Sequence, residues 1–87
     1  MLKKLANLGP KSEAMLRRSG VGTPDQLREL GAVHAFLKVK RQGEAPSLNL
    51  LWALEGALSE RSWQDVAKQD RLRLLLELEA AERATPP

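Results

Sequence analysis

Phosphate binding is the chemistry that best suits the stretch Gly9-Pro10-Lys11-Ser12. Glycine suits a sharp turn, and proline suits the first position of a helix because its missing N–H would be unpaired there. A helix that starts here presents unpaired backbone N–H groups and partial positive charge, on which a phosphate can dock. The lysine would add a charge and the serine a hydrogen bond. Such contacts position a nucleic acid but do not read its base sequence.

The same stretch has the pattern of a helix-hairpin-helix motif, with Asn7 in place of the first glycine. Asparagine is a tolerable replacement because it visits left-handed backbone conformations more readily than most residues. A second hairpin of this kind follows at residues 20–23, where Thr23 is a good N-cap ahead of a proline. We call residues 9–12 the first hairpin and residues 20–23 the second. Because short motifs match by chance, a plain turn between helices is the alternative interpretation.

Both hairpins lie in the basic half of the chain. Residues 1–43 contain nine basic and three acidic residues, a formal charge of +6. The remaining residues contain five basic and eight acidic ones, a formal charge of −3. This asymmetry suits a polyanionic partner such as DNA, although many solvated surfaces have a similar composition.

Three further basic residues lie close enough in the sequence to support the hairpins. Arg17 and Arg18 end the second predicted helix, where they either contact phosphate or only complement the helix dipole. Lys38 lies on a polar helix face that either contacts phosphate or is merely solvated. The predicted DNA-binding residues are Gly9, Lys11, Ser12, Arg17, Arg18, Gly22, Thr23 and Lys38.

Composition argues against several functional classes. The chain has 87 residues, no cysteine and a single histidine, which excludes a disulfide framework, a thiolate metal site and a histidine-based metal site or triad. No apolar run approaches the roughly 20 residues that span a bilayer, and the first residues lack the apolar core of a signal peptide. We expect a cytoplasmic, non-enzymatic protein without metal, cofactor, small-molecule substrate or membrane partner.

Hydrophobic spacing predicts an all-α fold, since no segment alternates with a period of two. We expect a compact bundle of five or six short helices with tandem helix-hairpin-helix-like turns. One domain is expected over residues 1–83 and a mobile tail over 84–87. The predicted helices cover residues 1–8, 11–19, 24–30, 32–42, 48–58 and 69–83, with one or two helical turns within 59–68.

Two helices carry most of the leucine. The helix over 48–58 is apolar nearly all round and should be the centre of the core, with Trp63 folded onto it. In the last helix, the expected inward face consists of Leu72, Leu75 and Leu76. Leu74 and Leu78 widen that face beyond what a narrow contact needs. We predict that these two leucines meet a partner or a second copy of the chain.

These features together resemble the C-terminal domain of TfoX/Sxy-type competence regulators. The resemblance covers nearly the whole chain up to about Leu76, and its most specific part is the run over 47–58. The matching segments are residues 5–12, 20–23, 27–33 and 47–58, together with Trp63. The first hairpin also looks like the one in the C-terminal domain of the bacterial RNA polymerase α subunit, which contacts DNA and activators.

The resemblance implies a bacterial regulator that turns on DNA-uptake genes together with the cyclic-AMP receptor protein. Full-length members carry a further N-terminal domain, so this chain is expected to be either one domain of such a regulator or a stand-alone relative. The first functional hypothesis is weak, salt-sensitive DNA binding through the two hairpins. The alternative is a protein-interaction module without direct DNA binding, which forms a homodimer or contacts a transcription activator or RNA polymerase.

Overall fold

The computed structural model describes residues 8–44 and 46–84, which form six α-helices and no strand. The expected all-α fold is confirmed. The predicted helix over 1–8 lies outside the described residues except for Leu8, which is buried. The last helix continues to Ala84, one residue beyond the predicted end. The helices are α1 (Pro10–Arg18), α2 (Pro24–Leu30), α3 (Ala32–Arg41), α4 (Leu48–Ser59), α5 (Trp63–Gln69) and α6 (Arg71–Ala84).

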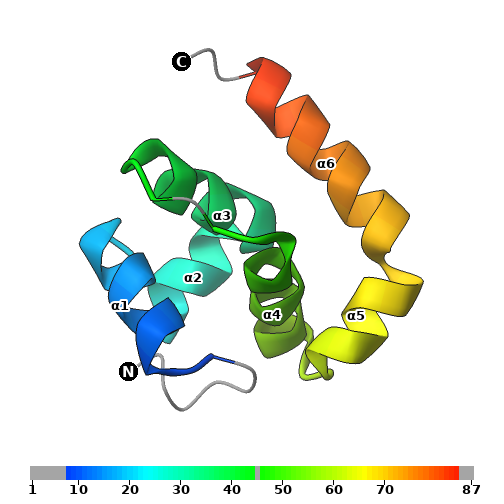
Figure 1. Cartoon of the computed structure of the whole chain (residues 1–87), viewed down its shortest axis with the longest axis horizontal. Coiled ribbons are helices and arrows are strands. Elements are labelled where there is room, and N and C mark those ends of the chain that lie inside the picture. Colours follow the sequence, from blue (N-terminus) through cyan, green and yellow to red (C-terminus); the bar gives the residue numbers. More distant parts are fainter. Residues whose placement is uncertain (1–7, 45, 85–87) are drawn as a thin grey trace.

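Helices α3 and α4 form the centre of the molecule. Figure 1 shows α1 and α2 on one side of this pair and α5 and α6 on the other. The apolar face of α4 buries Leu51 and Leu54 completely, and Phe36 of α3 is 4% exposed. Because burying one leucine side chain contributes about 1.5–3 kcal/mol, α4 supplies a large part of the core. The prediction that this helix is central is confirmed.

Short local signals fix where the helices begin and turn. Thr23 caps α2, and its hydroxyl accepts a hydrogen bond from the Gln26 N–H. Ser62 caps α5 in the same way. The turns after α1 and α2 depend on Gly20 and Gly31, whose φ angles of +89° and +83° are strained for residues with a side chain.

The orientation of α6 differs from the prediction. Leu74 and Leu78 face the core, whereas Leu72 and Leu76 are 70% and 58% exposed. Both pairs are four residues apart, so leucine spacing alone does not separate them. Ala81 extends the stripe of Leu74 and Leu78 and is also buried. The other stripe also reaches an alanine, Ala80, so the sequence does not say which stripe faces the core.

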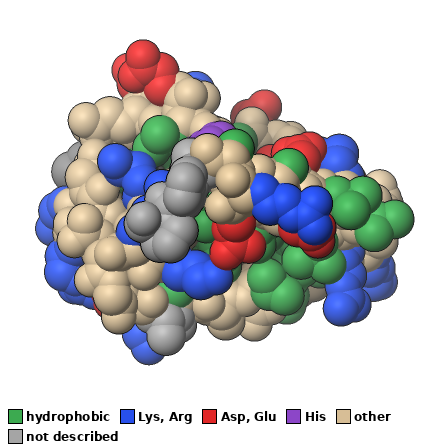
Figure 2. Space-filling model, turned by 90° about the horizontal axis from the view of Figure 1, so that it is seen from above, with side chains coloured by type: hydrophobic (Ala, Val, Ile, Leu, Met, Phe, Trp, Pro, Cys, Tyr) green, Lys and Arg blue, Asp and Glu red, His purple; other side chains and the backbone are tan. Residues whose placement is uncertain are grey.

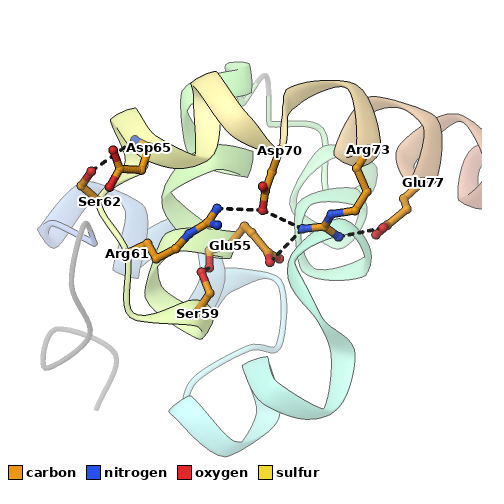
Figure 3. A network of polar contacts seen from close by, with 8 residues as sticks. All are labelled: Glu55, Ser59, Arg61, Ser62, Asp65, Asp70, Arg73 and Glu77. Atoms are coloured by element: carbon orange, nitrogen blue, oxygen red, sulfur yellow. Dashed lines mark hydrogen bonds and ion pairs between the residues drawn. The ribbon is translucent and has the colours of Figure 1, made fainter.

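A network of charged side chains joins α4, α5 and α6 (Figure 3). Asp70 accepts hydrogen bonds from Arg61 at 2.7 Å and from Arg73 at 2.9 Å. Arg73 also pairs with Glu55 at 3.1 Å and with Glu77 at 2.8 Å. The hydrogen bond from Arg73, and then that from Arg61, lowers the pKa of Asp70 against a partial desolvation that raises it. The network holds α6 with its Leu74 stripe toward the core.

This network predicts a pH-dependent contribution to stability. Because the native pKa of Asp70 lies below its unfolded value, the contribution is present above a pH of about 3.9 and is lost as the pH falls through the native pKa. Asp70→Asn should therefore lower the free energy of unfolding at pH 7, and the difference from wild type should shrink under acid conditions. Urea unfolding of both proteins, at pH 7 and at an acidic pH, measures this difference in the free energy of unfolding.

Glu29→Gln is the matched control, because Glu29 is exposed and has no ion pair within the described residues. It should change stability little at either pH. An Asp70→Asn effect that is equally large in acid would contradict the role assigned to the network.

Candidate nucleic-acid interface

The first hairpin leaves backbone N–H groups open to a ligand. Gly9 is the N-cap of α1 and provides no side-chain cap. The earliest helical hydrogen bond runs from the Glu13 N–H to the Gly9 carbonyl at 2.9 Å. Within the described part of the chain, the N–H groups of Lys11 and Ser12 have no hydrogen-bond partner and the Lys11 ammonium has no ion pair. These three groups are available for an anion.

Gly9 itself is not required by the backbone. Its φ of −91° and ψ of 179° are extended values that any residue adopts. A Cβ added at Gly9 would meet no atom within 4 Å. The expectation that the turn needs glycine here is therefore wrong. What glycine does provide is a bare backbone next to Lys11, which lets a ligand approach closely.

Arg17 is engaged inside α1 rather than presented to a partner. Its guanidinium bonds the Glu13 carboxylate at 2.9 Å, and Glu13 is only 8% exposed. The pair lies at the i,i+4 spacing that favours ion pairs on a helix. This spacing was visible in the sequence and identifies Arg17 as a structural partner of Glu13.

The second hairpin differs from the first because its N–H groups are already occupied. The amide oxygen of Gln26 accepts hydrogen bonds from the N–H of Gly22 at 2.7 Å and from that of Thr23 at 3.1 Å. Together with the Thr23 hydroxyl this forms a capping box. A phosphate would have to displace the glutamine side chain. The Thr-x-x-Gln spacing could have revealed this competition.

The other predicted cations gather at the far end of α1. Arg18 pairs with Glu44 at 2.7 Å. Lys38 lies beside the second hairpin, since a Cβ on Gly20 would be 4.0 Å from its Cε atom, and it has no ion pair within the described residues. Helix α1 has nine residues, so about 13 Å separates its two ends. The eight predicted DNA-binding residues thus form two groups rather than one site.

The predicted partner surface on the last helix is wrong. Leu74 and Leu78 are 1% and 8% exposed because they pack in the core. The exposed leucines of α6 are Leu72 and Leu76. Figure 2 shows hydrophobic side chains among charged ones at the end of the molecule where α5 and α6 lie.

Among the described helices, none is long and apolar enough to cross a membrane. Over residues 8–44 and 46–84, no three metal-ligating side chains lie close enough together to hold an ion.

Comparison with known proteins agrees with the resemblance seen in the sequence. The model of the TfoX C-terminal domain family matches residues 1–78. The chain is 35% identical over 77 residues to the DNA transformation protein TfoX of Haemophilus influenzae, which covers 88% of this chain. It is 37% identical over 76 residues to DNA transformation protein TfoX1 of Aliivibrio fischeri, which covers 83% of this chain. The chain spans 36% of the length of each relative.

A solved structure has the same fold. The crystal structure of a protein of unknown function from Listeria monocytogenes matches with a TM-score of 0.81 and 28% sequence identity. The match covers 93% of this chain and 100% of that one. The family model and the relatives show that the chain belongs to the TfoX C-terminal domain family.

Proposed function

We propose that this domain is a non-enzymatic bacterial transcription-regulatory module that binds the DNA backbone weakly and without base specificity. The observation that carries the proposal is the open start of α1, where two backbone N–H groups adjoin the unpaired Lys11. The basic character of residues 1–43 supports it. So do the relatives, which are named for DNA transformation. Regulation of DNA-uptake genes is the role that follows from this kinship.

The geometry favours few contacts. The start of α1 accommodates one phosphate, and Lys38, a residue of α3, lies near Gly20 beyond the other end of α1. Arg17 and Arg18 are held by Glu13 and Glu44, so they contribute less than their charge suggests. A small number of phosphate contacts gives weak binding whose strength falls with salt.

Removing the Lys11 charge tests the contact. Each neutralised phosphate contributes a slope of about −0.9 to log K against log salt, so Lys11→Ala should reduce the slope by about 0.9. Fluorescence anisotropy of a labelled duplex of arbitrary sequence, titrated at several salt concentrations, measures it. Lys68→Ala is the matched control because it removes the same charge from an exposed position on α5. An equal effect of both variants would reject a specific contact at Lys11.

The variant Gly9→Ala should weaken DNA binding while leaving the stability of the fold nearly unchanged. Since Gly9 has an ordinary φ and open space at its Cβ position, its replacement should change the free energy of unfolding by less than about 1 kcal/mol. The added methyl would hinder close approach of a phosphate, so duplex affinity should fall.

The comparison variant is Gly20→Ala, which strains a backbone with a φ of +89° and should cost about 1–2 kcal/mol of stability. Thermal unfolding and anisotropy are measured on all three proteins. Undiminished duplex affinity in Gly9→Ala would place the DNA away from the first hairpin.

The exposed stripe on α6 supports a second candidate function, self-association. Leu72 and Leu76 lie one turn apart and are the most exposed large hydrophobic side chains of the described residues. Arg71 precedes this stripe, and Glu77 and Glu79 follow it. An antiparallel pair of α6 helices would bring the basic start of each helix near the acidic half of the other. The small apolar area suits a weak homodimer.

Sedimentation equilibrium over a range of protein concentrations tests this candidate. The wild-type mass should rise with concentration, and the double variant Leu72→Gln with Leu76→Gln should stay monomeric because it removes the apolar contact. Both side chains are exposed, so the variant should keep the wild-type thermal midpoint. A wild-type protein that is monomeric at every concentration would exclude self-association through α6.

A further inference from the structure

A pocket of about 450 Å³ lies next to the first hairpin. It is lined from the start of α1, from the start of α4 and from Trp63, the first residue of α5. Its volume is in the range of small-ligand sites, about 300–1,000 Å³. The proposed DNA contact uses only Lys11 and Ser12 of this lining, so the other lining residues have no role in it.

Part of the pocket lining is apolar and aromatic. Met15 and Leu50 contribute its aliphatic part, and Trp63 contributes an indole ring. The sequence predicted that Trp63 folds onto the core, but the residue is 38% exposed. An exposed indole that lines a pocket is a surface on which a planar ring can stack.

Another part of the lining is polar and carries positive charge. It includes Lys11, Ser12 and Asn49, and no carboxylate is among the described residues that line the pocket. None of these three side chains has a hydrogen bond or an ion pair within residues 8–44 and 46–84. Ser47 also lines the pocket, and its hydroxyl makes no capping bond to α4. Hydrogen-bonding groups and an ammonium without an opposing acid suit a ligand that is anionic.

We propose that this pocket takes one unpaired nucleotide of a DNA strand, with its base against Trp63 and its phosphate at Lys11. A nucleotide combines the two features that the lining selects, a planar aromatic ring and a negative charge. The Asn49 amide can hydrogen-bond to the edge of a base. In duplex DNA that edge is already hydrogen-bonded to the opposite base. The inference deepens the proposed DNA contact and rests on it for the phosphate at Lys11. It adds a preference for unpaired over paired strands.

Tryptophan fluorescence gives a direct readout. The other tryptophan, Trp52, is only 5% exposed, so a ligand in the pocket should quench mainly Trp63. Oligothymidylate, a duplex of the same length and free thymidine monophosphate are titrated in parallel. The single strand should quench most strongly and at the lowest concentration. In Trp63→Leu, which lacks this fluorophore, the affinity for a labelled single strand is measured by anisotropy. It should fall roughly 5- to 150-fold, since stacking contributes about 1–3 kcal/mol per base.

The controls separate this pocket from the phosphate contact. Trp63→Phe keeps an aromatic ring and should retain most of the single-strand affinity, and circular dichroism verifies that both variants fold. Duplex affinity, measured by anisotropy, should be unchanged in both. Lys11→Ala should weaken the binding of single strand and duplex alike.

The outcomes are distinguishable. Single-strand affinity that is unaffected by Trp63→Leu overturns the pocket while leaving the duplex contact at Lys11 standing. Free nucleotide that quenches at the same concentration as the strand makes this a mononucleotide pocket and overturns the strand proposal. Duplex binding that is insensitive to Lys11→Ala overturns the proposed function, and with it the phosphate position assumed for the pocket.

Discussion

The packing of α3 against α4 is the contact on which every other element depends. Helices α1, α2 and α6 pack on α3, while α5 packs on α4. Leu51 and Leu54 of α4 and Val39 of α3 are fully buried in this centre. Because interiors are close-packed, a cavity at this centre would shift the helices on both sides. The positions of the α1 start and of the pocket beside it therefore depend on core residues that do not line the pocket.

The two hairpins show how similar residue types can differ in what they offer to a ligand. Both have glycine, proline and a hydroxyl residue near a helix start. At the second hairpin, the Gln26 amide oxygen already accepts the N–H groups of Gly22 and Thr23. At the first, no side chain caps α1. Capping satisfies donors that would otherwise bind an anion. The first hairpin is thus suited to binding and the second to stabilising the fold.

Much of the fold could be predicted from the sequence, because caps and apolar periodicity are local signals. Thr23, Gly20 and the leucines of α4 fixed element positions to within a residue or two. The face of α6 could not be read from leucine spacing, because Leu72–Leu76 and Leu74–Leu78 are equivalent pairs. Its orientation depends on Ala81 and on the tertiary ion pairs of Arg73. The site was predicted less well, since which cations are neutralised depends on partners such as Glu44, distant in sequence from Arg18.

The central claim is that DNA phosphate binds at the start of α1 and not at the start of α2. An NMR titration with a duplex of arbitrary sequence at low salt tests it most directly, because each backbone N–H is observed separately. The account predicts that the amide signals of Lys11 and Ser12 shift, that those of Gly22 and Thr23 change little, and that the shifts fade as salt rises. Shifts centred on the second hairpin, or none at low salt, would contradict it.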